Sequence, residues 1–189
     1  MSATGFEKDD LLLLVDVQKD FCPGGKLAIE DGDAILPELN RWIDKAREAG
    51  VPVYASRDWH PGVHISFQDQ GGAWPPHCVQ DSDGARFHPE LKLPFDAVVV
   101  TKGVRFDQDQ NSAFDQTGLA KWLRGRGIER IFLAGLAQDV CVLATALDAR
   151  EAGFEVVLLA EGTRPVSAAD GRTALEKMRE AGVRFWPAV

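Results

Sequence analysis

Short apolar runs alternate along the chain with longer segments in which apolar residues recur at the spacing of a helix. The first run, residues 11–17, is apolar at nearly every position, which is typical of a central parallel strand covered on both faces. We predict six strands, at residues 11–17, 51–56, 97–101, 130–134, 155–160 and 183–186. The helical spacing predicts four helices between them, at residues 33–49, 115–126, 140–152 and 168–181, and several of these segments end at a glycine.

The regular alternation of strands and helices predicts an α/β fold. Right-handed crossover connections then give a mostly parallel sheet with helices on both faces. A chain of 189 residues is long enough to bury one large core, so we expect a single domain over residues 1–189.

Composition and charge narrow the class of partner. The formal net charge of −8 and a pI near 5.0 leave no basic field for a phosphate backbone, so we expect no nucleic-acid partner. No apolar run is long enough to span a membrane, and residues 1–10 are polar and acidic, unlike a signal peptide. We therefore expect a cytoplasmic protein without a membrane partner, whose three cysteines are free thiols.

Residues 57–94 interrupt the alternation of strands and helices. Five prolines and four glycines exclude a regular element there, and a loop of this length in a compact domain is usually functional. All four histidines of the chain lie in this segment. The segment is therefore the first candidate for a functional site.

One carboxylate and three imidazoles of this segment form a candidate metal site. Asp58 and His60 continue the preceding strand, and residues two apart in an extended chain point to the same side. The candidate ligands are Asp58, His60, His64 and His77. This mixed oxygen and nitrogen set suits zinc, iron(II) or manganese(II), with water in the open positions. The alternative is that these histidines lie on a loop surface. His88 has no comparable partner, so we assign it a structural role rather than a metal-binding one.

A second candidate is Cys141, in the segment 135–141 that joins a predicted strand to a predicted helix. Asp139 is a suitable N-cap residue, which would place Cys141 in the first helical turn, where the helix dipole stabilises a thiolate. The alternative is that Cys141 is part of the core, because it lies in an apolar run and buried cysteines commonly serve in packing. The sequence context of Cys141 leaves both interpretations open.

Four chemically capable side chains follow four of the predicted strands. They are Asp16, Asp58, Lys102 and Cys141. Because ligands bind at the carboxyl ends of the strands in an open parallel sheet, we expect these side chains to face one crevice. A carboxylate, a cation and a thiol beside a metal site are the groups that a nucleophilic hydrolase needs. Taken separately, Asp16 could cap a turn and Lys102 could be a solvated loop residue.

Several motifs resemble the nicotinamidase/pyrazinamidase branch of the isochorismatase-like cysteine hydrolases, over roughly residues 11–186. They are DVQKDFCPGG at 16–25, DWH at 58–60, HISF at 64–67, WPPHC at 74–78, KG at 102–103, and GLA at 135–137 leading to Cys141. The motifs that contain the candidate metal ligands are the most specific of these, because relatives that act on isochorismate or carbamoyl compounds generally lack this ligand set.

The resemblance implies a three-layer α/β/α fold with a six-stranded parallel sheet. It also implies hydrolysis of nicotinamide to nicotinate and ammonia, with pyrazinamide as a further substrate. Asp16, Lys102 and Cys141 would form the catalytic triad, in which Cys141 attacks the amide to give a thioester. Asp16 would accept the thiol proton, while Lys102 holds that carboxylate and favours the thiolate. The backbone N–H groups of Ala137 and Cys141 would form the oxyanion hole, beside a cis peptide bond at Leu136–Ala137.

The resemblance further implies a cofactor and a substrate pocket. Asp58, His60, His64 and His77 would hold one divalent transition metal, Zn²⁺ in the first instance and Fe²⁺ or Mn²⁺ as alternatives, which orients the pyridine nitrogen. The substrate-binding residues would be Phe21, Leu27, Trp74, Leu136 and Ala137, although aromatic side chains also serve in ordinary core packing. The partner would be a small aromatic amide, and the family tends to form homo-oligomers.

Two positions depart from the family pattern. Val140 stands where a histidine or tyrosine is common, and Asn111 stands where a tyrosine is common. The reaction type survives both changes, but the loss of ring contacts would loosen the pocket for pyrazinamide or other aromatic amides. Two other interpretations stay open: another small-amide hydrolase with the same framework, and a non-catalytic metal-binding protein. The joint presence of the three triad residues disfavours the second.

Overall fold

Six parallel strands form one sheet in the computed structural model, which describes residues 5–187. The strands are β1 (Asp10–Val15), β2 (Val53–Asp58), β3 (Val98–Lys102), β4 (Arg130–Leu136), β5 (Glu155–Arg164) and β6 (Arg184–Trp186). Their order across the sheet is β3-β2-β1-β4-β5-β6, and every neighbouring pair is parallel. The predicted parallel sheet and its six strands are therefore confirmed.

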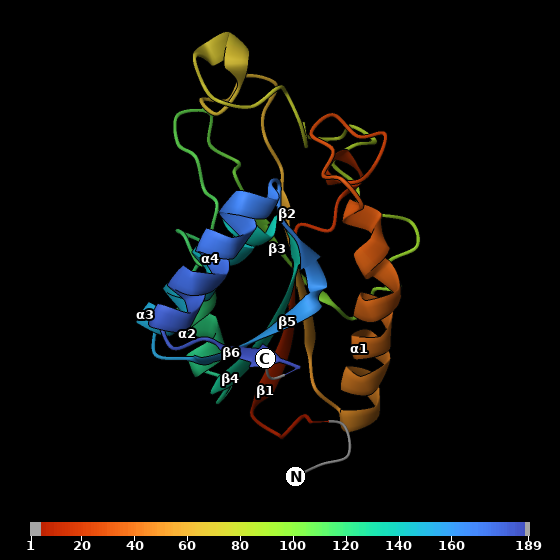
Figure 1. Ribbon diagram of the computed structural model, residues 1–189, viewed down its shortest axis with the longest axis vertical. Coiled ribbons are helices and arrows are strands. Elements are labelled where there is room, and N and C mark those ends of the chain that lie inside the picture. The colour runs from red at the N-terminus through yellow and green to blue at the C-terminus, as the bar shows by residue number, and fades with distance from the viewer. Residues whose placement is uncertain (1–4, 188–189) are drawn as a thin grey trace.

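Helices cover both faces of the sheet, as the strand and helix pattern predicts. They are α1 (Leu36–Ala49), α2 (Leu119–Arg124), α3 (Leu143–Glu151) and α4 (Ala168–Glu180). In Figure 1, α1 lies on one side of the sheet, and α2, α3 and α4 lie on the other. Within residues 5–187, none of the helices combines the length and the apolar character needed to cross a membrane.

Three helices begin later than their sequence pattern predicts, and α3 does so because the π-helical turn Gln138–Val142 precedes it. The segment before α1 is a 3₁₀ turn, Gly32–Ile35, and Pro37 then occupies the first turn of the helix, where its missing N–H leaves no bond unmade. The predicted helix at 115–126 shortens to the six residues of α2, because Gly118 adopts a left-handed conformation with φ of +76°. A residue in that conformation cannot belong to a right-handed helix.

The apolar run of β1 is the centre of the core. All six of its residues are buried, and its side chains alternate between the two faces of the sheet. Leu12 and Leu14 pack with α1, whereas Leu11 and Leu13 pack with the helices of the opposite face. Coverage on both sides explains why this strand carries almost no polar residue.

The strand order positions the functional residues. The chain builds outward from β1 to β3, and then returns to place β4 on the other side of β1. Such a reversal opens a crevice at the carboxyl ends of the two central strands. Val15 at the end of β1 is in register with Gly135 near the end of β4, so the residues that follow these two strands lie side by side.

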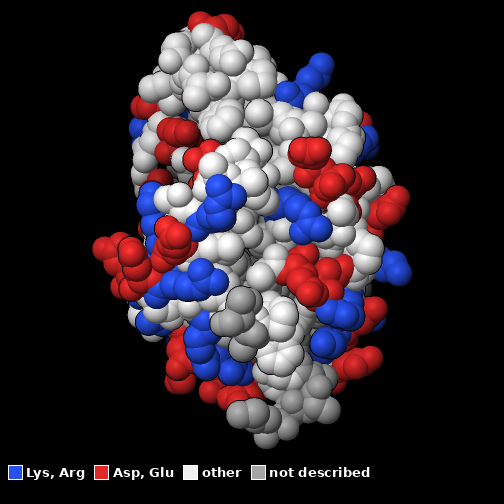
Figure 2. Space-filling view, viewed as in Figure 1, with Lys and Arg blue, Asp and Glu red and all other residues white. Residues whose placement is uncertain are grey.

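The segment between β2 and β3 is irregular, as predicted. Apart from a single 3₁₀ turn at Gln68–Gln70 and isolated bridges, it forms no helix or strand. In Figure 1 its yellow part caps the upper end of the molecule. Figure 2 shows few charged side chains at that upper left end, while Lys and Arg are interspersed with Asp and Glu over the rest of the same face.

Gly135 is a position where only glycine fits. Its φ is +124°, and a Cβ built there would lie 2.1 Å from the backbone oxygen of Val15. We expect Gly135→Ala to lower the free energy of unfolding by about 3 kcal/mol or more, measured by urea denaturation. Gly153→Ala is the matched control, because Gly153 has a φ of +93° but no atom within 4 Å of the added Cβ. Its expected cost is about 1 kcal/mol, and equal losses in both variants would exclude the steric explanation.

Candidate active site

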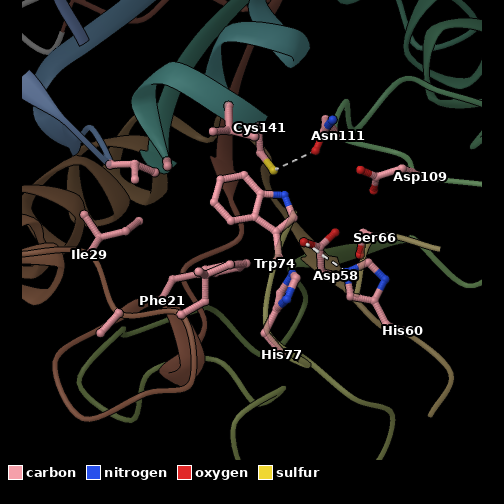
Figure 3. A pocket seen from close by; sticks show the side chains of 15 residues that line it. Phe21, Ile29, Asp58, His60, Ser66, Trp74, His77, Asp109, Asn111 and Cys141 are labelled. Carbon is pink, nitrogen blue, oxygen red and sulfur yellow. Dashed lines mark hydrogen bonds and ion pairs between the residues drawn. The ribbon is translucent and has the colours of Figure 1, made fainter. Parts of the chain in front are cut away.

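A pocket of about 520 Å³, including the space at its mouth, opens at the carboxyl ends of the strands. Its lining residues are Phe21, Leu27, Ala28, Ile29, Asp58, His60, Ser66, Trp74, His77, Asp109, Asn111, Ala137, Val140, Cys141 and Val166. In Figure 3, Phe21 and Ile29 lie on one side of the pocket, and Ser66, Asp109 and Asn111 lie on the other. The pocket thus has an apolar wall and a polar wall, an arrangement suited to a small aromatic molecule with polar substituents.

Four of the five expected substrate-binding residues line this pocket. They are Phe21, Leu27, Trp74 and Ala137. Leu136 does not line it, because its side chain is fully buried in the core on the α1 side of the sheet. The peptide bond between Leu136 and Ala137 is cis, as the resemblance implies.

Lys102 lies behind the pocket as a fully buried cation. Its Nζ is 2.7 Å from Asp16 Oδ2, 2.6 Å from Asp58 Oδ1 and 3.6 Å from Cys141 Sγ. Burial opposes the charge, but the two carboxylates outweigh it and raise the pKa of Lys102 well above its ordinary value. Lys102 is therefore an ammonium ion that holds two carboxylates and a thiol in one cluster.

Asp16 has the properties of a general base. Its Oδ1 accepts a hydrogen bond from the Ser56 hydroxyl at 2.6 Å. Its Oδ2 is buried and pairs with Lys102 at ion-pair distance, yet it accepts no well-directed hydrogen bond from any of residues 5–187. Burial raises the pKa of Asp16, although Lys102 opposes the change. A buried carboxylate with a free lone pair and a raised proton affinity is suited to accept a proton.

Cys141 projects into the pocket from a π-helical turn, Gln138–Val142, between β4 and α3. One oxygen of Asp16, one oxygen of Asp58 and Cys141 Sγ lie within 4.8 Å of one another. Burial raises the pKa of the Cys141 thiol well above its usual value, and Lys102 offsets this only in part. The group at rest is therefore a thiol beside a base.

The local structure before Cys141 differs from the prediction. Asp139 is not an N-cap residue, because Ala137 takes the cap position and Asp139 lies inside the π-helical turn. Its carboxylate instead accepts hydrogen bonds from the backbone N–H groups of Val166 and Ser167. The sequence contains no sign of this contact, since its two ends are separated by more than twenty residues.

Three of the four candidate metal ligands come together. Asp58, His60 and His77 each offer one ligand atom, and these atoms lie within 4.8 Å of one another. The Nδ1 of His60 is 2.9 Å from the Gly103 carbonyl, and the Nδ1 of His77 is 2.8 Å from the Pro75 carbonyl. A carbonyl only accepts hydrogen bonds, so each Nδ1 carries the proton and each Nε2 keeps a lone pair for a metal.

His64 is not part of this group, although its ring lies 4.1 Å from that of His60, measured between centroids. Its Nε2 is 3.1 Å from the Gln108 carbonyl, and its Nδ1 is 2.7 Å from the Ser66 hydroxyl. The carbonyl requires the proton on Nε2, which leaves Nδ1 to accept from Ser66. Both ring nitrogens of His64 are thus engaged within the protein.

Asp58 belongs to both clusters. Its Oδ1 pairs with Lys102 at 2.6 Å, while its Oδ2 faces the Nε2 of His60 at 3.6 Å. Burial works against its charge, but Lys102 prevails and lowers the pKa of Asp58 below its ordinary value. An ionised Asp58 therefore links the candidate metal group to the Lys102 cluster.

Two buried polar residues that our sequence analysis missed hold this geometry. The Gln18 side chain donates to the Asp58 carbonyl at 2.7 Å and accepts from the Asp58 N–H at 2.8 Å. Asp20 accepts from the backbone N–H groups of Cys78 at 2.7 Å and Lys26 at 3.0 Å. Both residues lie in the segment 16–25, but a hydrophobic pattern does not distinguish a buried polar residue from a solvated one.

Comparisons with known proteins agree with this geometry. The isochorismatase domain family matches residues 10–186. A nicotinamidase of Escherichia coli is 39% identical over 198 residues, which cover 93% of each chain. A pyrazinamidase of Pyrococcus horikoshii, solved in complex with zinc, superposes with a TM-score of 0.91 at 45% identity, covering 94% of this chain and 98% of its own. PnC1 of L. infantum, solved with nicotinate, gives a TM-score of 0.86 at 41% identity, with coverage of 93% and 91%.

The buried ammonium of Lys102 yields a stability prediction. Lys102→Met leaves Asp16 and Asp58 buried without their cation, so we expect the free energy of unfolding to fall by about 3–5 kcal/mol in urea denaturation at neutral pH. The control is Arg105→Met, which removes the cation of an ion pair with Asp107 whose side chains are both about half exposed. Solvent screens that pair, so the control should unfold like the unmodified protein. Equal losses would show that the buried pairing is not the cause.

Proposed function

The chain belongs to the isochorismatase family, and from this premise we propose that it is a nicotinamidase, which hydrolyses nicotinamide to nicotinate and ammonia and also accepts pyrazinamide. The observation that carries the proposal is the pairing, in one pocket, of the thiol Cys141 with the metal-binding group Asp58, His60 and His77. Such a pocket suits an aromatic amide whose ring contains a nitrogen. The metal would bind the ring nitrogen, and the thiol would attack the amide carbonyl.

We propose that Asp58, His60 and His77 hold a divalent transition metal, with zinc as the first choice and iron(II) or manganese(II) as alternatives. One carboxylate and two imidazoles with free Nε2 atoms are a donor set that zinc favours. When bound, the metal supplies a Lewis-acid position that takes the lone pair of a pyridine nitrogen and thereby orients the ring. Our expected fourth ligand, His64, would first have to give up its bond to Gln108. We therefore propose the three-residue set.

Asp16 and Cys141 carry the proposed reaction. The thiol proton moves to Asp16 as Cys141 Sγ bonds to the carbonyl carbon, and the oxyanion accepts hydrogen bonds from the backbone N–H groups of Ala137 and Cys141. The C–N bond then breaks, Asp16 returns the proton to the leaving nitrogen, and ammonia departs. Water attacks the thioester and gives its proton to Asp16, and the C–S bond breaks to release nicotinate, with the proton passing back to Cys141.

The remaining residues of the triad and pocket orient these groups. Lys102 holds Asp16 and lies 3.6 Å from Cys141 Sγ, where its charge stabilises the developing thiolate. We propose that Phe21, Trp74 and Leu27 contact the ring, since all three line the pocket. Asn111 and Val140 also line it, in place of larger aromatic residues of the family, and this favours a second candidate function: hydrolysis of a wider range of small aromatic amides.

The location and assembly of the protein are also proposals. We infer a cytoplasmic location, supported by three cysteines that are all buried free thiols, as suits a reducing compartment. We infer a homo-oligomer, supported by seven exposed large apolar side chains in the segments 63–65 and 95–106, at and beside the edge strand β3.

The nucleophile assignment is tested by Cys141→Ala. We expect the rate of ammonia release from nicotinamide to fall at least about a thousandfold, because no other group would form the thioester. Cys22→Ala is the matched control, since Cys22 is also a buried thiol but does not line the pocket, and it should keep most of the activity. Full activity of the Cys141 variant would refute the mechanism. Ammonia release from other aromatic amides, with none from nicotinamide, would favour the second candidate function.

The metal set is tested by elemental analysis of protein that has been loaded with zinc and dialysed. We expect about one zinc per chain in the unmodified protein and in His64→Ala, and much less in His77→Ala, because His77 has a free Nε2 whereas the Nε2 of His64 is bonded to Gln108. His88→Ala is the control for a histidine of the same loop segment outside the group. Equal zinc loss in the His64 and His77 variants would restore the four-ligand set.

A further inference from the structure

The loop between β5 and α4 contributes one wall of the pocket. Val166 lines the pocket although it is far along the chain from the other lining residues, and its side chain is 46% exposed. It lies in the same pocket as Val140, the residue before the candidate nucleophile. An exposed apolar side chain on a loop contributes to binding only if the backbone that carries it is held in place.

Asp139 holds that backbone. Its Oδ1 accepts a hydrogen bond from the Val166 N–H at 2.9 Å, and its Oδ2 accepts one from the Ser167 N–H at 3.4 Å. Within residues 5–187, neither N–H group has another acceptor. Among the described residues, the Asp139 carboxylate is therefore the only hydrogen-bonding anchor for these two amide groups, and it lies on the nucleophile turn, the π-helical turn Gln138–Val142 that carries Cys141.

We call the Asp139 carboxylate, together with the N–H groups of Val166 and Ser167 that it binds, the clamp. Contacts on either side reinforce the clamp. Ser167 is the N-cap of α4, and its hydroxyl oxygen accepts from the Asp170 N–H at 3.1 Å. Gln138 donates to the Thr163 hydroxyl at 2.7 Å. A Cβ at Gly171 would lie 3.0 Å from the side-chain oxygen of Gln138, so the first turn of α4 packs directly on the nucleophile turn. The β5–α4 loop and the turn that carries Cys141 thus form one unit.

We propose that Asp139 is a positioning residue that holds Val166 against the aromatic ring of the substrate, and so sets the affinity for flat aromatic amides. The proposal rests on the proposed function only for the identity of the ring. Asp139 does not contact the reacting atoms in this scheme. Its carboxylate fixes one apolar wall, while Cys141 and the metal group fix the two ends of the substrate.

The alternative is that Asp139 merely maintains the turn that carries Cys141. The two roles differ in what they change. A misplaced wall weakens binding and raises KM, whereas a distorted nucleophile turn lowers kcat. The two roles also differ in the double variant. If Asp139 acts only by positioning Val166, its removal has no further effect on KM once the Val166 side chain has been truncated.

The test is a double-mutant cycle in ammonia release from nicotinamide, with Asp139→Ala, Val166→Ala and the double variant. We expect each single change to raise KM about tenfold with kcat within about twofold, and the double variant to match the single ones. Asp139→Asn keeps a carbonyl acceptor for the Val166 N–H and should restore most of the affinity. Glu176→Ala removes an exposed carboxylate of α4 outside the clamp, and should leave KM within about twofold.

Hydrogen exchange provides a readout that does not depend on activity. We expect the amide protons of Val166 and Ser167 to exchange faster in Asp139→Ala, but not in Val166→Ala. Unchanged exchange in Asp139→Ala, a fall in kcat at constant KM, or multiplying effects in the double variant would each overturn the proposal. If the unmodified protein releases no ammonia from nicotinamide, the proposed function fails, and the exchange experiment still decides whether the clamp exists.

Discussion

The buried ammonium of Lys102 between Asp16 and Asp58 is the interaction on which the rest of the site depends. A charge without solvent is tolerated only when it is closely paired, so the ends of three strands must meet within a few ångströms. The parallel register provides this, since Asp58 at the end of β2 pairs with Lys102 at the end of β3, and Asp16 directly follows β1. The sheet thus holds two carboxylates close enough to stabilise a buried cation, and the cation in turn changes the proton affinities of its neighbours.

Asp58 connects the two kinds of chemistry in the pocket. One of its oxygens pairs with Lys102 and the other faces His60, so the candidate metal group and the Lys102 cluster share a carboxylate. The thiol of Cys141 lies 3.6 Å from the same ammonium, and burial keeps it protonated close to the Asp16 carboxylate. In the proposed reaction, this arrangement separates the group that would orient a ring from the group that would attack an amide, and Lys102 links the two groups.

Scattered backbone hydrogen bonds and two buried side chains from the segment after β1 hold the irregular segment between β2 and β3. Gln18 pairs with the backbone of Asp58, and Asp20 binds the backbone N–H beside His77. Gly84 lies so near that a Cβ there would be 2.2 Å from the Asp20 carboxylate, so the loop closes tightly around this anchor. Two polar residues after β1 therefore help to position both ends of the candidate metal group.

The order and kind of the elements, and the positions of the reactive side chains at strand ends, could be predicted from the amino-acid sequence. This was possible because burial on one or both faces leaves a periodic signature in neighbouring residues, as in the apolar run of β1. The pairing of donors with acceptors became visible only in the folded chain. The Gln108 carbonyl bonds to the Nε2 of His64, Leu136 faces the core, and Asp139 accepts from Val166 and Ser167 rather than capping a helix. These contacts join residues far apart in the chain, and a hydrophobic pattern records burial but not the partner of a polar group.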